Sequence, residues 1–322
     1  MKRPFSNRLH SSDGMADRFR DLLEEADPLV LAGCYDVLSA MMLERAEFPA
    51  VFLSGYGVAA SLLGNPDIGL TTLLETSLVT RALVTRLGVP VIVDADNGYG
   101  NEDNVVRLVS ELEHAGAAGM ILEDQVMPKR CGHTSNKEIV PLPVYMRKLE
   151  AALKARSTSL VVVARTDAVT LDEGIARANA FLKAGADVAL IDGLKSLDAL
   201  KRVGQEVIGP KQVNLIYGGK TPPLSVEELG ALGFKVILYS TPALFLVARV
   251  LLDQLPRLRV GNDLNTISSE SCTFSEFQDF VESRYAAHQA HQAQQAHRKS
   301  QSRLRAVREQ NSTEEVDRAD SE

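Results

Sequence analysis

The 322-residue sequence has no tryptophan and only three cysteines, at positions 34, 131 and 272. Such an odd and sparse set excludes a disulfide framework, and without a CxxC pair it does not indicate a zinc site. We therefore expect a reducing, cytoplasmic location, where a special cysteine would be a reactive thiol. Residues 1–17 lack the apolar stretch of a secretory signal, and no run approaches the roughly 18 apolar residues that span a membrane.

The sequence also has fewer basic than acidic residues, with 35 Lys and Arg against 42 Asp and Glu, which gives a net charge of −7. A chain of this kind gains no counterion-release attraction to nucleic acid and offers no basic face to anionic lipid. We therefore expect neither nucleic acid nor membrane as a partner.

A repeated unit is present, in which an amphipathic helix ends in glycine and is followed by a short apolar strand and a polar cluster. Clear copies span residues 113–124, 182–192 and 229–240. Strict alternation of strand and helix predicts a parallel sheet, and eight units favour closure into a (β/α)8 TIM barrel. An open doubly wound sheet is the alternative, but no GxGxxG follows the first strand. The predicted strands lie near 29–32, 50–53, 89–93, 119–122, 160–164, 187–191, 212–216 and 234–239.

The domain organisation follows from these units. Residues 1–27 are an N-terminal segment, and residues 28–287 are the catalytic barrel domain with an additional C-terminal helix at Phe274–Ala287. Residues 288–322 are polar and low in complexity, which predicts a disordered tail. Its histidines 288, 291 and 297 could form a metal tract, but the composition favours a solvated tail.

Polar side chains collect where the predicted strands end, and in a barrel these ends share the face on which active sites form. Three of them are carboxylates, Asp94, Asp96 and Glu123. Since side chains alternate along a strand, Asp94 and Asp96 are expected on the same side. A cluster of hard oxygen ligands predicts Mg²⁺, with Mn²⁺ as the alternative ion. For either aspartate alone, the competing interpretation is the N-cap of the helix that starts near Glu102. The full set of strand-end residues is Ser54, Asp94, Asp96, Glu123, Arg165, Asp167, Asp192, Asn214 and Ser240.

A long loop after the fourth strand contains Lys129, Arg130, Cys131 and His133. Neighbouring cations are expected to lower the pKa of the thiol and make it an acid or a nucleophile. The alternative is a buried, inert cysteine, which is how we interpret Cys34 and Cys272. Glycine-rich segments at residues 54–57 and 218–222 could cradle an anion, although they match neither a nucleophile elbow nor a P-loop.

Several of these stretches resemble the isocitrate lyase/phosphoenolpyruvate mutase superfamily over roughly residues 28–285. Lys129-Arg-Cys-Gly-His133 is the most specific and resembles the lyase branch, which includes methylisocitrate lyase and 2,3-dimethylmalate lyase. The other matching stretches are Ser54–Asp67, Asp94–Gly100, Glu123-Asp-Gln125, Ala164–Asp167 and Asn214–Pro222.

The resemblance implies a Mg²⁺-dependent carbon–carbon lyase acting on a small carboxylic acid, and a homotetramer that exchanges a C-terminal helix. It implies that Asp94 holds the metal mainly through water, with Asp96 and Glu123 beside it and Asp67 close by. Cys131 would protonate the enolate-like fragment, with Lys129 and His133 nearby, and Arg165 would contact substrate oxygens. The resemblance also implies that the substrate carboxylates are bound by Ser54, Gly55, Tyr56 and Asn214.

Three positions depart from the pattern of methylisocitrate lyases. Phe52 replaces a tyrosine. Asp192 replaces a glutamate, which is expected to shift a contact with the metal shell or the substrate. Asp192 and Asp67 are counted with the substrate-binding residues. Ile216 replaces a Ser or Thr that binds an additional carboxylate. Because an apolar side chain cannot donate that hydrogen bond, we expect a substrate with less charge than a tricarboxylate, such as an alkyl-substituted malate. Oxaloacetate decarboxylation or hydrolysis, phosphonate mutase chemistry, and more remotely a non-catalytic binding barrel remain the alternatives.

Overall fold

A computed structural model of the chain describes residues 14–134, 137–286, 288–290 and 293. Eight parallel strands pair in sequence order and close on themselves, because β1 is hydrogen-bonded to both β2 and β8. All eight strands expected from the sequence are present, so the TIM barrel is confirmed and the open sheet is excluded. The strands are β1 (Leu29–Cys34), β2 (Val51–Leu53), β3 (Val91–Asp94), β4 (Gly119–Glu123), β5 (Val161–Thr166), β6 (Val188–Ile191), β7 (Lys211–Leu215) and β8 (Val236–Tyr239).

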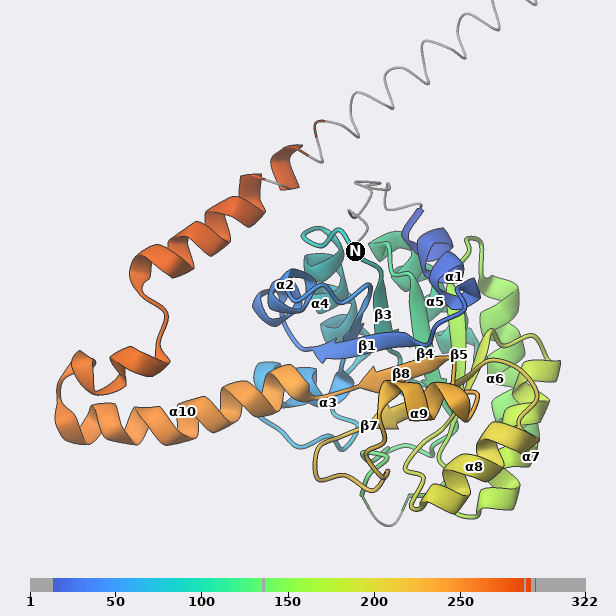
Figure 1. Cartoon of the computed structure of the whole chain (residues 1–322). Helices are drawn as coiled ribbons and strands as arrows, with labels where there is room; N and C mark the ends of the chain where they lie inside the picture. Colours follow the sequence, from blue (N-terminus) through green and yellow to red (C-terminus); the bar gives the residue numbers. More distant parts are fainter. Residues whose placement is uncertain (1–13, 135–136, 287, 291–292, 294–322) are drawn as a thin grey trace, which may run out of the picture. The chain divides into compact units, whose positions relative to one another are not determined.

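Helices connect the strands and surround the barrel (Figure 1). Most of them begin at a side chain that accepts a hydrogen bond from the first turn, such as Asn101 at α5 and Thr170 at α7. Several end at a left-handed glycine, such as Gly116 after α5. The connecting helices are α2 (Val37–Arg45), α3 (Gly55–Val58), the π-helix η2 (Ala59–Leu63), α4 (Leu73–Val84), α5 (Glu102–Ala115), α6 (Leu142–Ala155), α7 (Leu171–Lys183), α8 (Leu197–Glu206) and α9 (Val226–Ala231).

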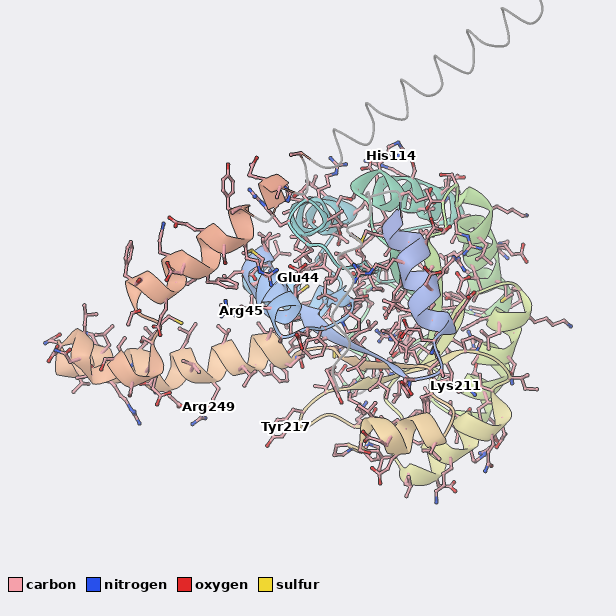
Figure 2. The ribbon with its side chains drawn as sticks, turned by 45° about the horizontal axis from the view of Figure 1, so that its top comes forward. Glu44, Arg45, His114, Lys211, Tyr217 and Arg249 are labelled. Carbon is pink, nitrogen blue, oxygen red and sulfur yellow. The ribbon has the colours of Figure 1, made fainter. Side chains whose placement is uncertain are left out.

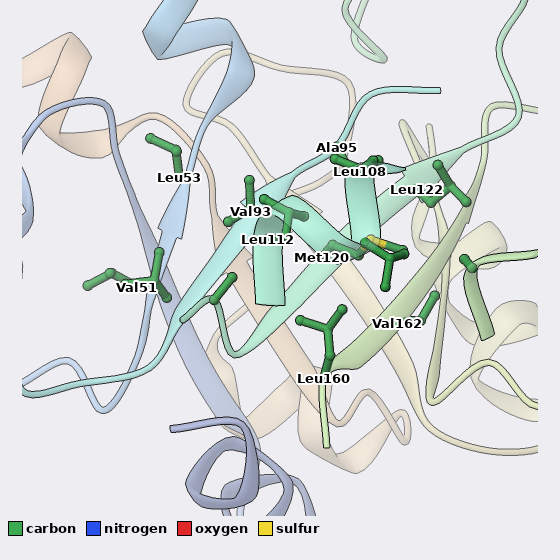
Figure 3. Close-up of a cluster of buried hydrophobic side chains, with 14 of the residues drawn as sticks. Val51, Leu53, Val93, Ala95, Leu108, Leu112, Met120, Leu122, Leu160 and Val162 are labelled. Atoms are coloured by element: carbon green, nitrogen blue, oxygen red, sulfur yellow. The ribbon is translucent and has the colours of Figure 1, made fainter. Parts of the chain in front are cut away.

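Side chains alternate along each strand and so divide the core into an inner and an outer set. The inner set fills the barrel with residues such as Ile92, Ile121 and Val163. The outer set packs strands against helices, and Figure 3 shows part of it, where strand residues meet Leu108 and Leu112 of α5. Met15 and Phe19 of α1 (Met15–Glu24) belong to the inner set. Helix α1 therefore covers the N-terminal end of the barrel, and only the opposite end is left for a site.

The C-terminal part begins with α10 (Pro242–Gly261), in which no residue is buried although much of the helix is apolar. Described residues up to Pro256 belong to the unit that contains the barrel, and those from Arg257 onward belong to a second unit. That second unit contains a 3-10 helix, η3 (Leu264–Glu270), and a helix over residues 274–286. The helix expected at this position is thus confirmed.

Most of the tail predicted at 288–322, and the first 13 residues of the predicted N-terminal segment, lie outside the described residues. Across the part of the chain that the structure describes, no helix combines the length and the apolar character needed to cross a membrane.

Candidate active site

The candidate site lies at the C-terminal ends of the barrel strands. Ile92, Ile121, Val163 and Leu190 face the barrel interior, so the residues two positions further along share that direction. This alternation places one layer of polar side chains above the apolar filling of the barrel. The layer consists of Ser54, Asp94, Glu123, Arg165, Asp192, Asn214 and Ser240.

Asp94 ends β3, and its carboxylate accepts hydrogen bonds from the backbone N–H groups of Gly55 at 3.2 Å and Asp96 at 3.3 Å. The expected strand alternation does not reach Asp96, because the strand has already ended and Asp96 has a left-handed φ of 46°. The two carboxylates are nevertheless close enough for Asp94 to raise the pKa of Asp96. The N-cap of α5 is Asn101, so the interpretation of either aspartate as that cap is wrong.

Lys129 lies buried between two carboxylates, with Nζ 2.6 Å from Asp67 and 2.6 Å from Asp96. Burial lowers its pKa, but Asp96 and the other nearby carboxylates outweigh burial and hold the pKa well above the ordinary value. Burial in turn raises the pKa of Asp96 to about 6, against the opposing effect of Lys129. Lys129 is therefore a fixed positive charge that ties the loop after β4 to the loop after β3.

Arg165 is the central cation of the layer. Its Nε and Nη2 hold Asp167 at 2.9 and 3.1 Å, and Nη2 also lies 2.8 Å from Asp192 and 3.3 Å from Glu123. Within the described residues Nη1 makes no hydrogen bond, which leaves it as a donor for a substrate oxygen. One guanidinium thus connects the ends of β4, β5 and β6.

Asp192 receives contacts from three sides. Besides Arg165, Asn214 Nδ2 donates to its Oδ1 at 3.1 Å, and His133 Nε2 lies 3.5 Å from the same oxygen. Burial alone would raise the pKa of Asp192, but Arg165 and His133 hold it far below the ordinary value. Asn214 Oδ1 in turn accepts a hydrogen bond from Ser240. The amide of Asn214 is therefore oriented on both sides.

The loop that contains Cys131 approaches this layer at Gly132. A Cβ on Gly132 would lie 1.8 Å from Asp192 Oδ2 and 2.5 Å from Arg165 Nη2, so a larger residue would fit only if the loop or these two side chains moved. His133 Nδ1 accepts a hydrogen bond from the backbone N–H of Lys220 at 3.0 Å. The loop is thus fixed to the strand ends at Gly132 and to the loop after β7 at His133.

Cys131 is partly buried, and the expectation that neighbouring cations lower its pKa is wrong. Burial, the largest influence, raises the pKa, and the charges of Asp192 and Asp67 raise it further, while the backbone N–H of His133 and the charge of Arg165 oppose them. Lys129 points to its two carboxylates instead, and Arg130 is exposed. At neutral pH the thiol therefore keeps its proton and is suited to donating it.

The segment Ser54-Gly55-Tyr56 forms the start of α3. The Ser54 hydroxyl accepts a hydrogen bond from Gly57 N–H at 3.3 Å, and Gly55 N–H is directed at Asp94. Tyr56 is partly exposed. Partial burial raises the pKa of its hydroxyl, and the charges of Cys131 and Asp67 raise it further. Tyr56, Cys131 and Asp67 therefore share one region of the site.

The carboxylates fit a hydrated metal ion better than a fully protein-coordinated one. Glu123 is 1% exposed, and its Oε1 is buried without a hydrogen-bond partner in the described part of the chain. Burial raises the pKa of Glu123 well above its ordinary value, an effect that a bound cation would reverse. No three His, Cys, Asp or Glu side chains among the described residues converge closely enough to hold a metal by themselves. Mg²⁺ commonly keeps several waters and takes only one or two carboxylates, so the donor set suits it.

A second polar network lies directly behind the layer and was not predicted from the sequence. Asp124 accepts hydrogen bonds from Thr166 Oγ1 at 2.6 Å, Arg177 Nη1 at 3.0 Å and Asp167 N–H at 2.9 Å. Arg177 also donates to the carbonyl of Val140, where the long loop returns. This network fixes both ends of that loop to β5.

Two further residues of the site were missed as functional candidates. Gln125 donates to Glu123 Oε2 at 3.3 Å and to the carbonyl of Arg130 at 2.8 Å. Lys137 Nζ lies 2.5 Å from Asp167. The sequence could have indicated Gln125, because it lies two residues after Glu123. It could not have indicated Lys137, because the sequence of a long loop does not show which carboxylate its lysine contacts.

Comparisons with known proteins agree with this geometry. The sequence profile of the phosphoenolpyruvate phosphomutase family matches residues 19–257. A 2,3-dimethylmalate lyase of Eubacterium barkeri is 38% identical over 270 residues, which cover 83% of this chain and 93% of the relative. A 2-methylisocitrate lyase of Aeropyrum pernix is 40% identical over 223 residues, covering 68% and 72%.

Among solved structures, an oxaloacetate acetylhydrolase in complex with 3,3-difluorooxalacetate superposes with a TM-score of 0.81 and 30% identity. The superposition covers 88% of this chain and 97% of that one. The chain therefore belongs to the isocitrate lyase/phosphoenolpyruvate mutase superfamily, in its lyase branch, and is an enzyme of the carbon–carbon lyase type.

Proposed function

We propose that this enzyme cleaves a substituted malate or methylisocitrate-like 2-hydroxy acid to a 2-oxo acid and a carboxylate, by Mg²⁺-dependent retro-aldol chemistry. In this reaction the 2-hydroxyl loses its proton, the C2–C3 bond breaks, and C3 takes up a proton. The names of the relatives from Eubacterium barkeri and Aeropyrum pernix, and the strand-end site, support the proposal.

Asp94, Asp96 and Glu123 are the residues that would hold Mg²⁺, or Mn²⁺ in its place. The buried and unpartnered Oε1 of Glu123 supports this assignment. The ion supplies Lewis-acid stabilisation of the negative charge that develops at the oxygen on C2. Lys129 holds Asp96 in place and partly offsets the repulsion among the carboxylates.

Cys131 is the proposed proton donor to C3. Its raised pKa keeps the thiol protonated, and the close packing of Gly132 against Arg165 and Asp192 fixes its position. This attachment of a cysteine-bearing loop to the strand ends is the single observation that supports a lyase most strongly. His133 is held between Lys220 and Asp192 and would position the loop rather than act on C3 itself.

Substrate carboxylates have two sets of donors available. Arg165 Nη1 and the N-terminal end of α3, at Ser54, Gly55 and Tyr56, would bind the 2-oxo acid portion. Asn214 would bind the other carboxylate, with Asp192 orienting its amide. A charged group in a site of this kind is stabilised only when such donors are already in place.

Ile216 supports a substrate with less charge than a tricarboxylate. Its side chain is half-buried directly after β7, while the next residue, Tyr217, is 95% exposed and projects from the surface (Figure 2). We expect Ile216→Ser to improve the turnover of 2-methylisocitrate relative to 2,3-dimethylmalate. Unchanged relative rates would remove the support that this position gives to an alkyl malate.

The proposal is tested by coupling oxo-acid release to lactate dehydrogenase and NADH. Wild type and Cys131→Ser are assayed with 2,3-dimethylmalate, 2-methylisocitrate and oxaloacetate, with Mg²⁺ and with EDTA. EDTA-sensitive release from a malate-type substrate that is lost in Cys131→Ser supports the lyase.

The second candidate is hydrolysis or decarboxylation of oxaloacetate, which the structural likeness to an oxaloacetate acetylhydrolase favours. Turnover of oxaloacetate alone that survives Cys131→Ser would replace the lyase proposal with this one. Oxalate and acetate as products would identify hydrolysis, whereas pyruvate would identify decarboxylation.

We also propose a homo-oligomer, with a tetramer as the expected state. The apolar residues of α10 support it, since Leu246, Leu252 and Leu255 are all more than half exposed. Light scattering of the full chain at several concentrations tests this assembly. For location we propose the cytoplasm, because the cysteines at positions 34, 131 and 272 are free thiols.

A further inference from the structure

A cavity lies beside the active site, over the ends of β5 and β6. Its volume is about 520 Å³, and three lysines line it, Lys137, Lys195 and Lys220. Asp192 is the one carboxylate among its lining residues, and forms part of the wall toward the catalytic layer. This lysine cavity belongs entirely to the unit that contains the barrel.

The positive charge of the lysine cavity is only partly neutralised by its surroundings, since Lys137 is paired with Asp167, whereas no carboxylate among the described residues forms an ion pair with Lys195 or Lys220. Asp192 is already paired with Arg165, and Asp167 is shared by Arg165 and Lys137. Among the described residues, Lys220 Nζ donates to one acceptor, the neutral carbonyl of Thr134. Lys195 is exposed, and no hydrogen bond or ion pair to it is found within the described residues.

Nearby acids do not compensate for these lysines. Thr170 and Leu171, at the N-terminal end of the 13-residue helix α7, line the cavity and contribute the positive end of the helix dipole. Two acids of the first turn of α7 are already paired, Asp172 with Arg202 and Glu173 with Arg177. The mutual repulsion of the lysines also appears at Lys220, whose pKa is lowered by burial and then by Lys137 and Lys195, against the smaller opposing effect of Asp192.

We propose that the lysine cavity is an anion-binding subsite that takes one carboxylate or phosphate group at the ammonium groups of Lys137, Lys195 and Lys220. An anion there would neutralise the charges of Lys195 and Lys220, for which the described residues supply no ion-pair partner, and would contact Lys137 on its side away from Asp167. Its position against Asp192 places the bound anion next to the catalytic layer. The occupant is then either a carboxylate of the substrate on its way to the barrel or a separate inorganic anion.

Binding of inorganic phosphate to the full chain tests the subsite without any assumption about the reaction. Isothermal titration calorimetry compares wild type, Lys195→Gln, Lys220→Gln and the matched control Lys201→Gln, an exposed lysine of α8 that does not line the cavity. We expect saturable binding that each cavity variant weakens about two- to fivefold, the range for one partly exposed charged contact. The control should bind as wild type does. Equal binding by all four proteins, or none by wild type, would overturn the subsite.

A kinetic arm, which rests on the proposed function, distinguishes the two sources of the anion. Phosphate is added to the assay of oxo-acid release with wild type and Lys195→Gln. Competitive inhibition that is weaker in the variant assigns the subsite to the substrate carboxylate. Phosphate binding with no change in KM assigns it to a separate anion. Failure of the lyase assay itself leaves the calorimetric result standing.

Discussion

The variant Gly132→Ala tests how closely the loop that contains Cys131 must approach the barrel for activity. The added carbon would lie 1.8 Å from Asp192 and 2.5 Å from Arg165, whereas ordinary contacts begin near 3.4 Å. The loop or the ion pair between Asp192 and Arg165 must therefore move by roughly 1.5 Å to restore an ordinary contact distance. A misplacement of about 1 Å costs on the order of 100-fold in rate. We expect Gly132→Ala to lower kcat by at least that factor.

The stability of the same variant should fall less than its activity. Overpacking costs about 1–3 kcal/mol in the free energy of unfolding, which urea denaturation measures. Gly174→Ala is the matched control, because its methyl group meets only side-chain carbons, Ile191 Cγ2 at 3.0 Å, Ile191 Cδ1 at 3.6 Å and Ala168 Cβ at 3.8 Å. This change should preserve activity, because the gain of about 0.5–1 kcal/mol from replacing glycine inside a helix offsets the small shift required of Ile191. A folded Gly132→Ala enzyme with kcat within about threefold of wild type would refute the close-approach argument.

Three other changes test separate parts of the site. Cys131→Ser should lower kcat by about 10²–10⁴-fold. Because burial raises the pKa of the wild-type thiol, its proton is retained throughout the neutral range and lost only above the ordinary pKa of a thiol, so a fall in the wild-type rate between pH 7 and 8 would contradict this role. Glu123→Gln should abolish the rise in Tm that Mg²⁺ gives the wild type, and an undiminished rise would exclude Glu123 from the metal site. Arg177→Met should lower the free energy of unfolding by about 3–5 kcal/mol, because it leaves Asp124 buried without its cation; urea denaturation that shows less than about 1 kcal/mol would contradict that role.

Much of the fold and of the strand-end layer could be predicted from the sequence. Buried parallel strands appear as continuous apolar runs, and their ends are marked by the first polar residue. Residues such as Glu123, Arg165 and Asn214 follow directly from that pattern, because all strand ends meet at one face of a barrel. The layer was thus predictable from local sequence together with one topological rule.

The partners within the layer could not be predicted, because they depend on distances between loops. Nothing local distinguishes Lys129, which is buried between two aspartates, from the exposed Arg130 next to it. The pKa of Cys131 was wrongly predicted for the same reason, since sequence proximity to cations does not reveal where those cations point. The left-handed backbone at Asp96 is also set by the loop as a whole.

The adjacent acids at the end of β4 face opposite sides of the sheet, and this has a consequence for how the enzyme could diverge. Glu123 faces the barrel mouth, whereas Asp124 anchors the outer network to Thr166 and Arg177. Substitutions at the mouth that spare the contacts of Gly132 and Lys129 can therefore change which bond is broken without loosening the outer network of Asp124 and Arg177, which holds both ends of the loop. A scaffold with chemistry and anchoring on separate faces can acquire new reactions through a few inward positions. Selection can then act on reaction and stability almost independently.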